Sequence, residues 1–199
     1  MDRWPTWGKR FQPGLFIIQP PEDVSAVVNA QRKACDPLSQ SYIGAHITVT
    51  QPLIRTPSES EWDSIEQVLG NMRPFAIHYG PLKSFLPYPC IWYDVQPAEG
   101  VLAIREALHQ TGFFNLEEGY IADFIPHMTI TEGQSGPEVT RELLEKLQKE
   151  SQSGSFLCEE LVLSVPDQNF YFSVQNRIAL GNVISQAPGS SIAHPESRS

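Results

Sequence analysis

Two copies of a His-x-Thr motif are the residues in this sequence whose types and spacing could do chemistry. His46 and Thr48 form the first copy, and His127 and Thr129 form the second. Both copies lie in runs rich in apolar and β-branched residues, which favour β-strands. Because residues two apart in a strand point to the same face, each motif is expected to present one imidazole and one hydroxyl on a common surface.

This set of groups suits the cleavage of a phosphodiester. Histidine titrates near neutral pH, so it can act as a general base or a general acid, and two histidines on opposite sides of a phosphorus can act in line. Threonine hydroxyls can donate hydrogen bonds to the non-bridging oxygens, where negative charge is held. The scheme requires no metal and no cofactor. A single His-x-Thr is more often an ordinary polar strand face, but two copies in similar surroundings favour the functional interpretation.

The elements around the motifs follow a repeated order. The first half of the chain predicts a strand, a helix, the first motif strand and a helix, and the second half, from Ile91, predicts the same order again. We expect two related lobes. The predicted strands are 14–19, 42–50, 74–79, 82–86, 91–95 and 124–131, followed by a closing hairpin of 156–165 and 170–180. The predicted helices are 22–34, a helix capped by Thr56 that runs to Met72, 100–109 and 137–149.

Composition limits the class of ligand and the location. The chain has 199 residues and a net charge of -9, with 23 acidic and 14 basic residues. Such a protein repels a long polyanion, which favours a small nucleotide or an RNA end over duplex DNA. The three cysteines are scattered and predict neither a disulfide framework nor a zinc site. The N-terminal residues predict no signal peptide, and no apolar run is long enough to predict a membrane helix. We therefore expect a cytoplasmic monomer without a membrane partner.

The paired motifs resemble those of the 2H phosphoesterase superfamily, which includes the 2′-5′ RNA ligases, also called RNA 2′,3′-cyclic phosphodiesterases. The resemblance runs from about Gly14 to Leu180. Further support comes from the segments 73–80, 85–92 and 124–126. It implies an α+β fold of two pseudo-two-fold-related lobes, each a mostly antiparallel sheet flanked by helices, with the active site in a cleft between them. One bilobal domain would then span residues 1–183, with a disordered C-terminal tail at 184–199.

The resemblance also implies roles for the motif residues. His46 and His127 would be catalytic, and Thr48 and Thr129 would bind phosphate. Further residues are weaker candidates for contacts to a base or a phosphate, because aromatic residues in short strands are more often core and single cations more often surface. These candidates are Phe85, Trp92, Tyr93, Arg55 and Lys83, and Tyr88 and Arg177 are further candidates of the same kind. The remaining histidines, His78, His109 and His194, are interpreted as structural.

Three functions remain open at this stage. The first is a metal-independent phosphodiesterase that hydrolyses a 2′,3′-cyclic phosphate, or a related 2′-5′ linkage, of a nucleotide or RNA end. The second is a module that binds a nucleotide or RNA end in the same cleft without turnover. The third is an RNA 2′-5′ ligase, which the net charge disfavours because a larger RNA would be repelled.

Overall fold

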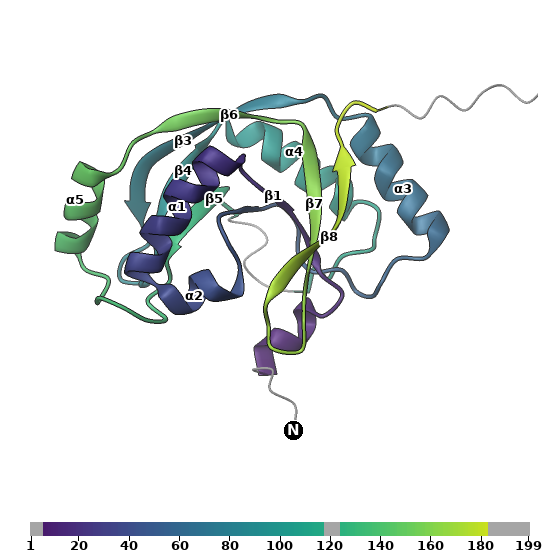
Figure 1. Cartoon of the computed structure of the whole chain (residues 1–199). Helices are drawn as coiled ribbons and strands as arrows, with labels where there is room; N and C mark the ends of the chain where they lie inside the picture. Colours follow the sequence, from purple (N-terminus) through teal and green to yellow (C-terminus); the bar gives the residue numbers. More distant parts are fainter. Residues whose placement is uncertain (1–5, 118–123, 183–199) are drawn as a thin grey trace, which may run out of the picture.

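The structure, a computed structural model, consists of two antiparallel four-stranded sheets flanked by helices (Figure 1). It describes residues 6–117 and 124–182, so the tail expected at 184–199 lies outside the described residues. The first sheet has the order β2-β1-β7-β8 and the second the order β5-β4-β3-β6. The strands of the first sheet are β2 (Ile47–Thr48), β1 (Leu15–Ile18), β7 (Glu160–Pro166) and β8 (Phe172–Ala179). Those of the second are β5 (His127–Thr131), β4 (Ile91–Gln96), β3 (Phe75–Ser84) and β6 (Gly154–Cys158).

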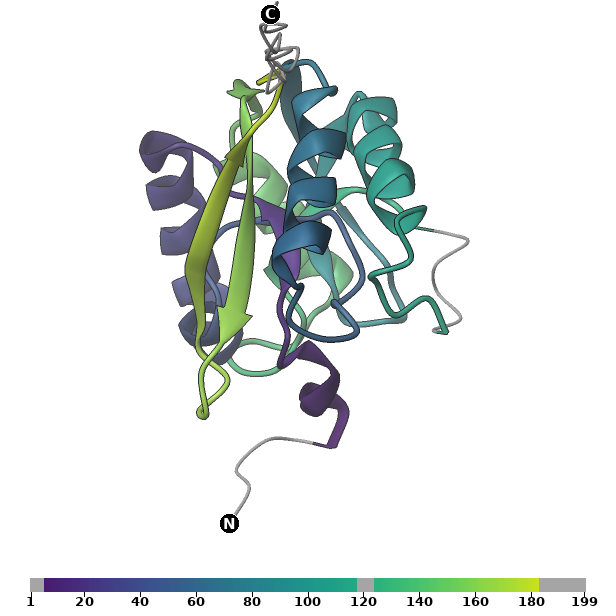
Figure 2. The same ribbon diagram turned by 90° about the vertical axis from the view of Figure 1, so that its right-hand side faces the viewer.

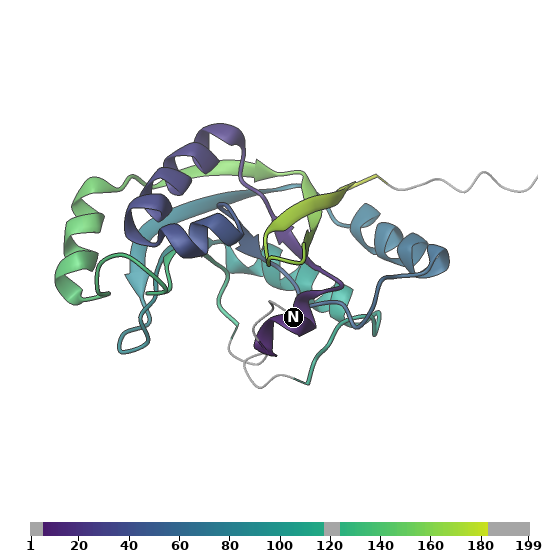
Figure 3. The same ribbon diagram turned by 60° about the horizontal axis from the view of Figure 1, so that its bottom comes forward.

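The helices divide between the two sheets. They are η1 (Thr6–Phe11), α1 (Glu22–Cys35), α2 (Pro37–Tyr42), α3 (Glu59–Gly70), α4 (Ala98–His109) and α5 (Arg141–Glu150). Helix α1 packs on β5 and α5 on β3, whereas α3 packs on both β8 and α4. Figure 2 shows α3 and α4 side by side, and Figure 3 shows α5 and α3 at opposite ends of the molecule. Within the described ranges, no helix combines the length and hydropathy that crossing a membrane requires.

Matching registers relate the two sheets. Thr48 of β2 pairs with Ile17 of β1, and Thr129 of β5 pairs with Trp92 of β4. Each motif therefore lies on an edge strand beside a strand that precedes it in the chain. The predicted α+β fold with two antiparallel sheets is confirmed. The two sheets do not correspond to the N-terminal and C-terminal halves of the chain, although the repeated order of elements predicted that they would. The C-terminal strands β7 and β8 complete the first sheet, and β3 joins the second.

One hydrophobic core joins the two sheets. Buried residues of β1 and β2, such as Phe16 and Ile47, belong to the same cluster as Tyr93 and Met128 of the second sheet. Val28 of α1 and Ile104 of α4 close this cluster from the helices. The relative placement of the motif strands is therefore set by a shared core and not by a flexible linker.

Two predicted strands differ from the structure for local reasons. The strand expected at 42–50 shrinks to Ile47–Thr48. Tyr42 belongs to α2, whose start is fixed by Asp36 and Pro37. After Thr48 the regular ladder ends, because the Phe16 amide donates to the side chain of Thr50 and the Phe16 carbonyl accepts from both Val49 and Thr50. The strand expected at 156–165 is divided between β6 of one sheet and β7 of the other, with the break at Glu159. The hairpin of β7 and β8 is confirmed.

The helix expected after Thr56 begins two residues later than predicted. Its N-cap is Ser58, and a capping box joins Ser58 to Glu61 instead of joining Thr56 to Glu59. The three cysteines are buried and unpaired, as expected.

Candidate active site

The two motif strands pack against each other where the sheets meet. Ile47 and Met128, the middle residues of the motifs, are fully buried, whereas the histidine and threonine of each motif are half-buried. The strand alternation therefore places the polar side chains of each motif on the open face, as its period predicts. The structure brings the four motif residues onto two adjoining edges.

Both imidazoles are held by equivalent hydrogen bonds. His46 Nδ1 lies 2.8 Å from the carbonyl oxygen of Gly44, and His127 Nδ1 lies 2.7 Å from that of Ile125. A carbonyl only accepts, so each Nδ1 carries the proton and donates it. In the neutral rings, Nε2 is therefore the basic nitrogen. Each histidine is oriented by the residue two positions before it, so the motif supplies its own positioning contact.

The environment favours the neutral form of both histidines. Burial, followed by the positive charges of Arg32 and then His127, lowers the pKa of His46 to about 4, against the opposing effect of its hydrogen bond to Gly44. Burial also lowers the pKa of His127, against the opposing effect of its bond to Ile125. Because His127 affects the pKa of His46, the two rings lie within electrostatic reach of each other. At neutral pH both rings are therefore neutral in the unliganded protein.

An aromatic pair borders His127. Phe85 and Trp92 are stacked with ring centroids 4.8 Å apart, and their centroids lie 5.7 and 5.5 Å from that of His127. Trp92 is the cross-strand neighbour of Thr129, so the pair shares the face of the second motif. On the first sheet the equivalent neighbour of Thr48 is the aliphatic Ile17. The cross-strand neighbour of the threonine is therefore aromatic in the second motif and aliphatic in the first, where Phe11 and Phe172 pack against the cluster that contains Ile17.

Lys83 lies on this same sheet face. Its Nζ is 2.7 Å from Asp94 Oδ2 and 5.8 Å from the centre of the Trp92 ring. Asp94 is the cross-strand neighbour of His127, and Lys83 that of Trp92. An ammonium thus lies two strands away from the second motif, with a carboxylate between them.

Other predicted candidates point elsewhere. Tyr93 is fully buried on the opposite face of β4, where its hydroxyl donates to Gln31 of α1 at 2.8 Å. It is core because neighbours along a strand alternate faces. Arg55 forms two bonds of 2.7 Å to Glu61 at the start of α3. Arg177 contacts Gln19 and Glu160, and Tyr88 is exposed in the loop after β3. The structure does not bring Tyr93 or Arg55 to the motifs.

Sequence reasoning missed three buried polar residues around the motifs. Arg32 of α1 donates to the carbonyl of Thr129, Arg105 of α4 donates to that of Val49, and Asp36 accepts hydrogen bonds from the turn after β5. The signal available in the sequence is an arginine at a position of the apolar helix face, as Arg32 is between Val28 and Cys35, since charged residues are rarely buried without a partner. Their acceptors could not be read from the sequence.

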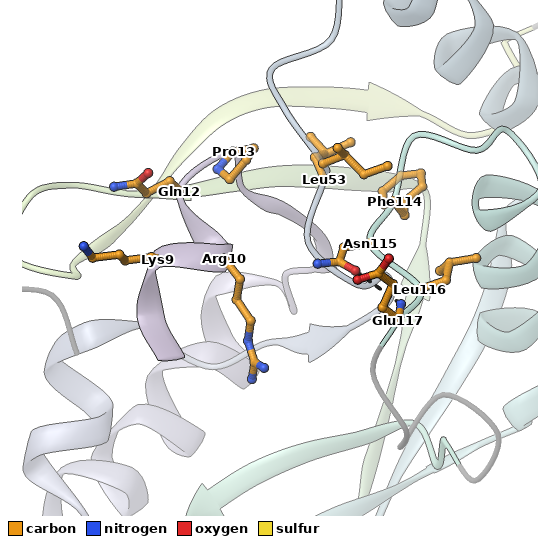
Figure 4. A pocket seen from close by; sticks show the side chains of 10 residues that line it. Lys9, Arg10, Gln12, Pro13, Leu53, Phe114, Asn115, Leu116 and Glu117 are labelled. Carbon is orange, nitrogen blue, oxygen red and sulfur yellow. Dashed lines mark hydrogen bonds between the residues drawn. The ribbon is translucent and has the colours of Figure 1, made fainter. Parts of the chain in front are cut away.

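A separate hollow of about 420 Å³ opens between η1 and the segment after α4 (Figure 4). Lys9 and Arg10 line one side and Asn115 and Glu117 the other. None of the four motif residues lines it. The hollow is therefore distinct from the paired motifs.

The fold and the motifs together define a two-sheet α+β protein with paired His-x-Thr edge strands. The family model described as the 2′-5′ RNA ligase superfamily matches residues 20–169, and the chain belongs to this superfamily. Among curated relatives, a protein of Bacillus cereus (strain ATCC 10987 / NRS 248) named "Putative phosphoesterase" is 29% identical over 131 residues, which cover 62% of this chain and 71% of the relative.

Solved structures show the same fold. The protein TT0787 of Thermus thermophilus superimposes with a TM-score of 0.56 at 17% identity, over 84% of this chain and 97% of that one. E. coli LigT in complex with ATP gives 0.51 at 16% identity, over 83% and 96%. LigT has also been solved with 3′-AMP and with NADP+. The predicted resemblance and fold are confirmed.

Proposed function

We propose that this protein is a metal-independent phosphodiesterase that hydrolyses the 2′,3′-cyclic phosphate of a nucleotide or an RNA end. The observation that carries the proposal is the pair of adjoining His-x-Thr strands, with each imidazole fixed through Nδ1 and each threonine on the same face. Membership of the 2′-5′ RNA ligase superfamily, and relatives named as phosphoesterases, support this class of activity. The nucleotide complexes of LigT support a nucleotide-sized ligand.

The chemistry needs one base and one acid. In our scheme, water attacks phosphorus as one histidine accepts its proton at Nε2, a new P–O bond forms, and the bond from phosphorus to one ribose oxygen breaks. The other histidine, as imidazolium, donates a proton to that oxygen. Thr48 and Thr129 donate hydrogen bonds to the non-bridging oxygens, whose charge grows in the transition state. After the reaction, the histidine that acted as base releases its proton to solvent, and the histidine that acted as acid takes one up.

The environments of the two rings favour one assignment. The low pKa of His46 suits a base that is neutral at pH 7. His127 then takes the role of acid, and the anionic phosphate raises its pKa once the substrate is bound, since an opposite charge stabilises the imidazolium. Phe85, which is half-buried and stacked on the buried Trp92, offers a nucleobase a stacking surface beside His127. Such a contact contributes about 1–3 kcal/mol per base in other proteins.

One experiment tests the activity. The protein is incubated with 2′,3′-cyclic AMP, CMP, GMP and UMP and with an oligonucleotide that ends in a cyclic phosphate, and products are identified by mass and chromatography. We expect His46→Ala or His127→Ala to lower kcat on the order of 10²-fold. His78→Ala, at an exposed position of β3, is the matched control and should keep the parent rate. Hydrolysis by the double variant His46→Ala/His127→Ala at the parent rate would overturn the proposal.

The two rival functions give different results in the same assay. A binding module would raise the melting temperature in the presence of a cyclic nucleotide and form no product. A ligase acting on a large RNA would show an affinity for tRNA-sized RNA that falls steeply with salt. Nothing in the site favours either rival, because binding alone does not require two oriented imidazoles.

A further inference from the structure

Arg32 connects the two motif segments from behind the site. It is only 2% exposed. Its Nη1 donates to the carbonyl oxygen of Thr129 at 2.6 Å, and its Nη2 donates to that of Ile43 at 3.0 Å. Ile43 lies three residues before His46, and Thr129 two residues after His127. One planar guanidinium therefore donates hydrogen bonds to the backbone near each of the two histidines.

A second buried arginine occupies a related place. Arg105 of α4 donates to the carbonyl oxygen of Val49, just after the first motif, at 2.8 Å, and its guanidinium lies 4.0 Å from the centre of the Phe124 ring. Each motif segment is thus bonded by an arginine from the helix that precedes the other motif in the chain. Arg32 differs in that its bonds include both motif segments, and its positive charge acts on His46.

We propose that Arg32 is a positioning residue of the two-histidine reaction, which sets the separation and orientation of His46 and His127 by bonding the backbone beside each. The inference rests on the proposed function. Arginine suits this task because its rigid fork places two donors in a fixed geometry, which an ammonium cannot do. In-line catalysis is sensitive to such geometry, since a displacement of about 1 Å can cost about 10²-fold in rate.

The positive charge of Arg32 also affects the pKa of His46. The carboxylates of Glu132 and Asp36 lie near enough to act on the guanidinium, and His46 is the histidine that the guanidinium affects. Cys90 also lies nearby, but burial raises the pKa of its thiol to about 12, so it is neutral. Removing the positive charge of Arg32 removes one of the effects that lower the pKa of His46, so this pKa should rise. Lysine at this position keeps the charge and loses the fork. Substitution by lysine and by an uncharged residue therefore separates the effect of the Arg32 hydrogen bonds from the effect of its charge.

The experiment compares Arg32→Lys and Arg32→Met with the parent in steady-state hydrolysis of 2′,3′-cyclic nucleotides and in NMR titration of the His46 ring. For Arg32→Met we expect kcat to fall on the order of 10-fold or more, KM to stay within about threefold, and the pKa of His46 to rise. For Arg32→Lys we expect the same loss of kcat with a smaller rise of that pKa. Circular dichroism and thermal unfolding establish that each variant is folded, and Arg32→Gln replaces Arg32→Met if the latter is not.

Two control variants separate positioning from general stability. Arg105→Met removes the other buried guanidinium and should lower the melting temperature while leaving the pKa of His46 near the parent value. Lys33→Met removes an exposed charge from the next position of α1 and should change neither quantity.

Folded Arg32→Met with the parent kcat would overturn the proposal, whether or not the His46 titration moves. A loss of kcat matched by Arg105→Met at equal loss of stability, with the His46 titration unmoved, would also overturn it. Absence of turnover in the parent would instead refute the proposed function, and the titration would still report on Arg32.

Discussion

At the scale of single residues, the hydroxyl groups of the two motif threonines can be removed with little change in stability, so substitution there tests their part in catalysis. Thr48 and Thr129 are half-buried on β-strands, where valine has the same shape and a high propensity. We expect Thr48→Val and Thr129→Val each to lower kcat by about 10- to 10³-fold, because a donor to the developing charge is lost. Steady-state kinetics with a cyclic nucleotide checks this, and Thr56→Val, at an exposed loop position, is the control. Parent-like kcat in both variants would remove the hydroxyls from the mechanism.

The lowered histidine pKa values predict the pH dependence of the rate. In the unliganded protein the pKa of His46 is about 4, so the acidic limb of kcat/KM should lie well below the ordinary histidine value of about 6.5. Bound phosphate stabilises imidazolium, so the acidic limb of kcat should lie at higher pH than that of kcat/KM. Profiles of both constants from about pH 3 to 9 test the order of the limbs. A kcat/KM limb at or above pH 6.5 would contradict the assignment of His46 as base.

The sequence located the motif residues because strand alternation is a local property. The sequence could not show whether Trp92 or Tyr93 lies on the same sheet face as His127. The two residues are neighbours on one strand, and only the pairing of β4 with β5 decides this. The acceptor of Arg32 lies 97 positions away, and no local pattern specifies it. The candidate residues could be chosen by their types and spacing, while the buried residues that contact them through tertiary packing could not.

At the scale of elements, Asp36 joins α2 to the turn after β5. Its buried carboxylate accepts hydrogen bonds from the amides of Ser39, Glu132 and Gln134 and from two side-chain hydroxyls, those of Thr131 and Ser135. We expect Asp36→Asn to lower the free energy of unfolding by about 1–3 kcal/mol, because an amide group cannot accept all of these bonds. Urea denaturation measures the change, and Asp23→Asn on the exposed face of α1 is the control.

The same carboxylate gives this effect a pH window. Burial alone would raise the pKa of Asp36, but its hydrogen bonds outweigh burial and lower it below the ordinary value. The unfolded state then binds the proton more readily, so the stabilisation is full above the unfolded pKa of about 4 and is lost as the pH falls through the folded pKa. The difference between parent and Asp36→Asn should shrink below pH 4. A constant difference down to pH 2 would show that the carboxylate charge is not involved.

The elements also show where prediction from sequence reaches its limit. Helices α1 and α4 follow from apolar periodicity, and the hairpin of β7 and β8 from two apolar runs around a turn sequence. The assignment of strands to sheets did not follow, because β6 and β7 are separated by one residue yet join different sheets. A continuous β-rich run carries no signal for such a break, since the partners that cause it come from β3 and β1.

At the scale of the whole molecule, the shared core makes the two sheets one unit of stability. Residues of both sheets and of helices α1 and α4 belong to one buried cluster. Neither sheet has a separate core of comparable size, since the second cluster among the described residues centres on Leu15, Ile17 and Val162 alone. Unfolding should therefore be cooperative, and the histidines within this unit should all report on the same transition.

This cooperativity gives the stability of the protein a defined acid dependence. Burial lowers the pKa of His46 and of His109 to about 4, and that of His127 in the same direction. His109 also accepts the amide hydrogen of Gln51 at Nε2, a bond that protonation removes. Between the unfolded value of about 6.5 and the folded values the unfolded state binds more protons, so stability falls as the pH falls through this window. After allowance for solvent screening, each of the two larger shifts corresponds to on the order of 2 kcal/mol.

We therefore expect the melting temperature of the parent to decrease between pH 6.5 and pH 4. In His109→Gln the decrease should be smaller over the same range, because glutamine does not titrate while its carbonyl can still accept a hydrogen bond. His78→Gln, at an exposed position, should follow the parent curve. Calorimetry at half-unit intervals of pH compares the three proteins. Parallel curves for the parent and His109→Gln would show that burial of His109 does not couple its proton to folding, and the acid dependence would then have to come from the two motif histidines.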